Sequence, residues 1–141
     1  MINNCDIVDI KGWRPLRLAY MGDVVYELYI REMLIKRRDV SVHRLHVESI
    51  GYVKAAAQSY ILHEILDELN EDERDIVRRG RNAKSATVPK NARVADYRYA
   101  TAFEALIGYL YLSNNKNRLN EIISMAVEAI DKKMLKDVEK S

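Results

Sequence analysis

The chain of 141 residues lacks the paired cysteines of many secreted proteins and the long apolar runs of membrane proteins. Its single cysteine, Cys5, excludes a disulfide framework within the chain and fits a reducing compartment. No apolar run approaches the roughly 18 residues that a membrane span needs. The start of the chain carries Asp6 and Asp9 and no basic segment, which is unlike a secretory signal peptide. We therefore expect a cytoplasmic protein that does not associate with membranes.

Proline and glycine are also scarce, with two and five residues respectively. Alanine, leucine, glutamate, lysine and arginine, the residues that favour helices, are abundant. A hydrophobic content of 48% is typical of a globular protein, and 141 residues suffice for one core. Because we find no internal repeat and no linker, we expect a single all-α domain over residues 1–141.

Hydrophobic periodicity locates the expected helices along the chain. Residues 15–37 form a long amphipathic pattern in which Tyr20, Val24 and Leu28 recur at every fourth position. Such a broad apolar face suits a central helix or a seam between subunits. Further helices are expected over residues 41–69, where Gly51 could interrupt the helix, and over 71–79, 94–112 and 117–135. Gly80 is placed to end the third helix, and residues 81–93 are expected to form a loop.

Charge is distributed unevenly along the chain. Residues 78–98 contain seven basic residues and one acid, whereas the rest of the chain has sixteen basic and twenty acidic residues. A basic segment on a mildly acidic body favours a polyanionic partner such as a nucleic acid at that segment. A solvated basic loop is the alternative. The basic residues are Arg78, Arg79, Arg81, Lys84, Lys90, Arg93 and Arg98.

Two acids stand alone within apolar helices. Asp23 is the only charged residue in positions 18–26, and Glu104 is the only one in positions 99–115. A buried carboxylate needs water, a cation or a metal to stay ionised. Two such acids on two core helices could converge on one divalent cation, and Mg²⁺ often uses only one or two carboxylates in proteins. In the alternative, both acids face water, or Glu104 pairs with Arg98.

Two short segments carry a family resemblance. Residues 18–28 (Leu-Ala-Tyr-Met-Gly-Asp-Val-Val-Tyr-Glu-Leu) resemble the signature helix of the ribonuclease III family. Residues 101–112 (Thr-Ala-Phe-Glu-Ala-Leu-Ile-Gly-Tyr-Leu-Tyr-Leu) resemble its second catalytic helix. The short chain, the form of the signature, and the segments 79–84 (Arg-Gly-Arg-Asn-Ala-Lys) and 89–92 (Pro-Lys-Asn-Ala) resemble the Mini branch of that family.

The resemblance implies a homodimeric, all-helical catalytic domain without a separate double-stranded-RNA-binding domain. It implies Mg²⁺-dependent cleavage of double-stranded RNA that leaves 5′-phosphate and 3′-hydroxyl ends, with Mn²⁺ as a substitute cation. It further implies maturation of both ends of precursor 23S ribosomal RNA, with a large-subunit ribosomal protein on the substrate as a potential partner.

Asp23 and Glu104 match two acids of the family's catalytic site, so the resemblance implies that they are catalytic and bind the metal. The larger family members carry two more acids, at the positions of Ala19 and Thr101. The expected RNA contacts are Arg78, Arg79, Arg81, Lys84, Lys90 and Arg93. Because two acids are absent, a non-catalytic RNA-binding or ribosome-assembly protein on this fold is one alternative. A helical interaction protein, with its two acids far apart and facing solvent, is another.

Overall fold

The computed structural model describes residues 9–83 and 93–140. These residues form helices and no strand, which confirms the all-α prediction. None of the helices in the described ranges is long and apolar enough to cross a membrane. In chain order the elements are η1 (Ile10–Gly12), α1 (Pro15–Arg37), α2 (Val42–Val53), α3 (Ala55–Ile65), η2 (Leu66–Glu68), α4 (Glu71–Asn82), α5 (Val94–Leu112) and α6 (Lys116–Glu139).

Local signals fix where several helices begin. Pro15 is the first residue of α1. The backbone N–H of a first helical residue has no acceptor within the helix, so proline, which lacks this group, loses no hydrogen bond there. The Ser41 side chain accepts a hydrogen bond from the Arg44 N–H at the start of α2. At the start of α4, Asn70 and Glu73 form a reciprocal capping box. These caps satisfy N–H groups that have no partner within the helix.

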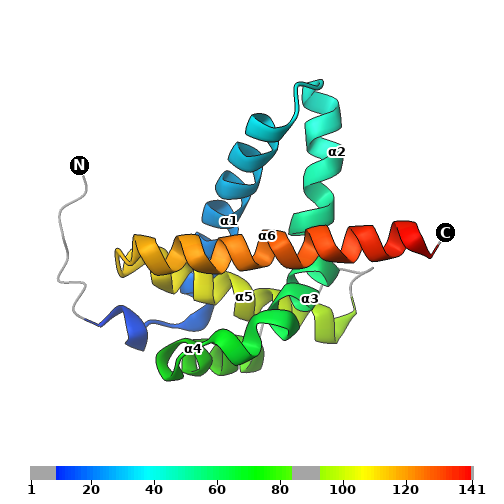
Figure 1. Ribbon diagram of the computed structural model, residues 1–141. Helices are drawn as coiled ribbons and strands as arrows, with labels where there is room; N and C mark the ends of the chain where they lie inside the picture. Colours follow the sequence, from blue (N-terminus) through cyan, green and yellow to red (C-terminus); the bar gives the residue numbers. More distant parts are fainter. Residues whose placement is uncertain (1–8, 84–92, 141) are drawn as a thin grey trace.

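Helix α5 lies at the centre of the fold and contacts α1, α3, α4 and α6 (Figure 1). Its buried face carries Phe103, Leu106, Ile107 and Leu110. In Figure 1, α1 and α2 form an upright hairpin, and α6 runs across the molecule so that its C-terminal turns extend past the other helices. The core is therefore formed by packing around α5, and the side chains on α5 are held on several sides.

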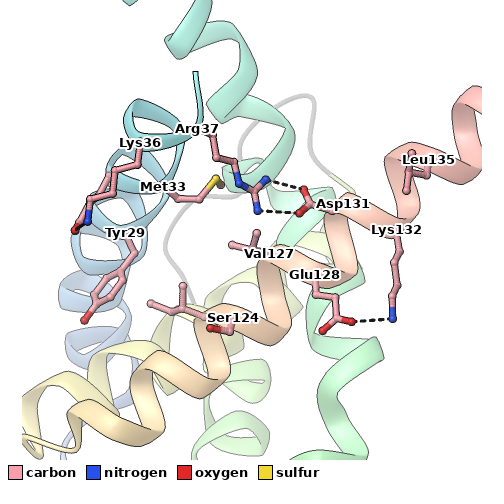
Figure 2. A pocket seen from close by; sticks show the side chains of 12 residues that line it. Tyr29, Met33, Lys36, Arg37, Ser124, Val127, Glu128, Asp131, Lys132 and Leu135 are labelled. Atoms are coloured by element: carbon pink, nitrogen blue, oxygen red, sulfur yellow. Dashed lines mark hydrogen bonds and ion pairs between the residues drawn. The ribbon is translucent and has the colours of Figure 1, made fainter. Parts of the chain in front are cut away.

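A hydrogen-bonded chain joins the hairpin to α6. The buried Tyr26 hydroxyl donates to the Tyr52 carbonyl at 3.0 Å, and the Tyr52 hydroxyl donates to Asp131 at 2.6 Å. Arg37, at the end of α1, reaches the same carboxylate of α6 and donates to it at 3.1 Å (Figure 2). Burial, followed by the Asp131 hydrogen bond and charge, raises the pKa of Tyr52 to about 12. These bonds fix α1 and α2 relative to α6.

Two expected helix limits are wrong. The long second helix breaks at Lys54, where the backbone is extended, and Gly51 lies within α2. Helix α4 continues past Gly80 to Asn82. Gly80 allows α4 to pack closely against α5, because a Cβ there would lie 2.8 Å from the Ala102 Cα of α5. Packing of α4 against α5, which a single helix pattern does not reveal, decides the role of Gly80.

The final helix is longer than the sequence pattern predicts. The final helix, α6, runs over Lys116–Glu139 rather than 117–135. The expected loop 81–93 is shorter at its start, because Arg81 and Asn82 belong to α4. Residues 84–92 lie outside the described residues, as do residues 1–8 with Cys5.

Candidate active site

Two glycines allow α1 and α5 to cross with their backbones in contact. A Cβ on Gly22 would lie 1.7 Å from the Glu104 carbonyl oxygen, and one on Gly108 would lie 1.9 Å from the Leu18 carbonyl oxygen. Neither position has space for any side chain. Because Asp23 follows Gly22 in α1, this crossing brings it next to Glu104 of α5.

The crossing brings together the two acids singled out in the sequence. The Asp23 and Glu104 carboxyl groups are hydrogen-bonded, which requires them to share a proton. Asp23 is exposed, whereas Glu104 is partly buried. The arrangement contradicts the alternative in which the two acids lie far apart. Their roles in catalysis and metal binding remain predictions.

The pKa of Glu104 is raised to about 8. Burial is the largest cause, because it penalises the charged carboxylate. The hydrogen bond with Asp23 and the Asp23 negative charge add to the increase, whereas a hydrogen bond with Gln58 opposes it. At neutral pH Glu104 is therefore mostly protonated, and a cation held by the two acids would favour its ionised form.

The donor set of the pair fits a hard divalent cation. Mg²⁺ binds oxygen ligands and usually keeps several waters, so two carboxylates can hold it. The described part of the chain contains no cluster of three or more His, Cys, Asp or Glu residues that could hold a metal. Ala19 and Thr101 are buried, and the Thr101 hydroxyl donates to the Tyr97 carbonyl of its own helix at 3.0 Å. The pair is therefore a sparse site.

The predicted RNA contacts differ in what surrounds them. Arg79 donates to the Lys11 carbonyl at 2.5 Å and to the Trp13 carbonyl at 2.7 Å, which attaches α4 to the start of the chain. Arg78 forms an ion pair with Asp75 in its own helix. Lys84 and Lys90 lie outside the described residues, whereas Arg81 and Arg93 are exposed on either side of that gap.

Sequence reasoning missed Gly22, Gly108 and Gln58. A signal existed for the glycines, since glycine within a helix is destabilising and usually has a packing reason. The signal for Gln58 was weaker. It lies among the apolar residues of α3, near Ala57, Ile61 and Leu62, and its side chain is buried with theirs.

A groove of about 610 Å³ lies between α1 and α6, away from the acid pair (Figure 2). Apolar side chains that include Met33 and Val127 line it, and the ion pairs Arg37–Asp131 and Lys132–Glu128 border it. None of the predicted site residues lines this groove. The groove therefore does not contain the chemistry that the sequence predicted.

The raised pKa of Glu104 makes stability depend on pH. In the unfolded chain this carboxyl titrates near its ordinary value of 4.5, and in the folded protein near 8. Between these values the folded protein holds the extra proton, so the free energy of unfolding decreases as the pH rises. In urea unfolding with a chelator at pH 5 and pH 8, we expect Glu104→Gln to lose less stability than the unaltered protein. Equal losses in the two proteins would contradict this.

Comparison with known proteins gives consistent results. Residues 16–115 match the model of the Ribonuclease III domain. The chain is 52% identical over 120 residues to a Mini-ribonuclease 3 of Clostridium tetani, covering 84% of this chain and 80% of that one. It is 51% identical to a Mini-ribonuclease 3 of Thermoanaerobacter sp., covering 83% and 82%. A crystal structure of a Fusobacterium nucleatum protein superimposes with a TM-score of 0.77 at 32% identity, covering 85% and 96%.

Proposed function

The chain belongs to the ribonuclease III family, in its Mini-ribonuclease 3 branch, and from that premise we propose that it cleaves double-stranded RNA with a divalent cation bound by Asp23 and Glu104. The observation that carries the proposal is the contact between these two carboxyl groups at the helix crossing. The cation is Mg²⁺, with Mn²⁺ as a substitute, because two oxygen ligands leave positions for water and for RNA phosphate.

When bound, the cation would supply an activated water and neutralise the charge that develops on the phosphodiester. The protein contributes the placement of this chemistry. Asp23 is exposed and accessible to an RNA backbone, whereas Glu104 is held in the central helix. A cation held by Asp23 and Glu104 would take the place of the proton that the two carboxyls share. The backbone contact between α1 and α5 fixes the distance between the acids before RNA arrives.

The basic segment supplies the RNA-binding surface in this proposal. Arg81 and Arg93 are exposed at the end of α4 and the start of α5, so they are available to phosphates. Lys84 and Lys90 remain RNA contacts that only the sequence predicts. Phosphate contacts of this kind read the shape of an A-form duplex rather than its sequence, and they make binding salt-dependent.

We expect the active form to be a homodimer. An apolar stripe on α1, formed by Leu16, Tyr20, Val24 and Leu28, is exposed to solvent, with Tyr20 82% exposed. Large exposed apolar stripes mark interaction surfaces. A two-fold dimer across this stripe would carry two equivalent acid pairs, one for each strand of a duplex.

A charge within the stripe tests the dimer. Leu28 is 60% exposed, so Leu28→Asp is tolerated by a lone subunit but disrupts an apolar interface. We expect sedimentation equilibrium to show one subunit mass for Leu28→Asp and twice that mass for the unaltered protein. Leu135→Asp places the same charge at a 65% exposed leucine of α6 and should remain dimeric. A dimeric Leu28→Asp protein would place the interface elsewhere.

The substrate in the cell is, in this proposal, precursor 23S ribosomal RNA, whose two ends the enzyme matures in the cytoplasm. The support is the similarity to Mini-ribonuclease 3 proteins over most of the chain and the resemblance of the segments 18–28, 79–84 and 89–92 to that branch. A large-subunit ribosomal protein bound to the RNA would then help to present the cleavage site.

A cleavage assay tests the proposed function. Purified protein is incubated with a duplex RNA, and in parallel with each strand alone, in Mg²⁺ or in excess chelator. We expect cuts in both strands of the duplex only when Mg²⁺ is present, with 5′-phosphate ends. Binding to the duplex without cleavage would contradict this expectation and favour the non-catalytic alternative.

A further inference from the structure

A buried amide lies beside the acid pair. Gln58 belongs to α3, and its side chain is 3% exposed. Its Nε2 donates to the Val53 carbonyl at 2.9 Å, across the break between α2 and α3. The same side chain lies close enough to the Glu104 carboxyl of α5 to lower the pKa of that carboxyl. Gln58 therefore connects a fixed backbone point to one of the two candidate cation ligands.

Capping the helix break does not by itself explain this amide. Its Oε1 is buried and has no hydrogen-bond partner among the residues that the structure describes. A buried oxygen without a partner is costly, and one hydrogen bond to a carbonyl returns only a modest gain. An apolar side chain would fill the same space without that cost. The contact with Glu104 is the remaining reason for an amide at this position.

We propose that Gln58 is a positioning residue of the cation site, which holds the Glu104 carboxyl toward Asp23 from a fixed point on the α2–α3 break. The inference rests on the proposed function, since it assumes that the acid pair binds a cation. Gln58 has no contact with the RNA in this role and acts through Glu104. Outer hydrogen-bond partners of this kind orient metal ligands, and their loss typically weakens metal binding by about 10- to 100-fold.

Mn²⁺ binding without RNA tests the inference directly. Electron paramagnetic resonance measures free Mn²⁺ in titrations of the unaltered protein, Gln58→Met and Asp23→Asn. Gln58→Met keeps the length of the side chain and removes its donors. We expect the Mn²⁺ dissociation constant to rise about 10-fold or more in Gln58→Met, and binding at the pair to be lost in Asp23→Asn. Should Gln58→Met fail to fold, Gln58→Asn, which keeps an amide but shortens its reach, should show the same weakening.

The control separates positioning from stability. Tyr52→Phe removes the Tyr52 hydrogen bond to Asp131, so it weakens the attachment of α2 without a change near Glu104. We expect it to lower the unfolding midpoint and to leave Mn²⁺ affinity unchanged. Normal Mn²⁺ affinity in Gln58→Met, or an equal loss in Tyr52→Phe, overturns the role of Gln58 alone. Equal Mn²⁺ binding by the unaltered protein and Asp23→Asn overturns the proposed function together with this inference.

Discussion

Asp23→Asn is expected to slow cleavage of duplex RNA by about 10³-fold or more while the protein stays folded. A bound cation stabilises a phosphodiester transition state by several kcal/mol, and about 4 kcal/mol corresponds to a factor of about 10³ in rate. Asparagine keeps the size of the side chain but removes its negative charge, so one of two carboxylate ligands is lost. Stability should not fall at neutral pH, because Asp23 is exposed and its charge disfavours ionised Glu104.

The measurement is the initial cleavage rate of a labelled duplex RNA in Mg²⁺, with circular dichroism to confirm the fold. Asp39→Asn makes the same chemical change at an exposed residue just after α1 and should cleave at the normal rate. Excess chelator should reduce the unaltered protein to the rate of the variant. A rate of Asp23→Asn within a few-fold of normal would exclude Asp23 as a ligand that the reaction needs.

Among substitutions that add one methyl group to the α1–α5 interface, Gly22→Ala is expected to lower the free energy of unfolding most. The new Cβ would lie 1.7 Å from the Glu104 carbonyl oxygen, which is backbone and cannot rotate away. The two central helices must separate, so we expect about 3 kcal/mol of destabilisation or more. Cleavage should fall as well, because the same crossing sets the distance between Asp23 and Glu104.

Gly51→Ala is the matched control for this prediction. Its Cβ would lie 2.7 Å from the Met134 Cε, the far end of a flexible side chain that can move. Alanine also favours a helix over glycine by up to about 1 kcal/mol. Urea unfolding should therefore place Gly51→Ala close to the unaltered protein and Gly22→Ala far below it. Similar midpoints for the two variants would show that the helix crossing tolerates a side chain.

Much of the fold follows from local patterns in the chain. The limits of α1 and α5 agree with those predicted, because Pro15 sets the start of α1 and long apolar periods define both helices. Asp23 and Glu104 were found by the same reasoning, since a lone charge in an apolar helix needs an explanation. Both inferences depend on features within one helix, which sequence periodicity reports directly.

The sequence by itself determined an all-helical protein, its family and two acids of interest. Only the tertiary structure showed that Gly22 and Gly108 let two backbones touch, and that Gln58 reaches Glu104. It also showed that Arg79 binds the Lys11 and Trp13 carbonyls, although its charge had suggested RNA. The physical reason is that a helical period fixes which side chains share a face. Which faces then meet, and how closely, depends on the packing of residues far apart in the chain.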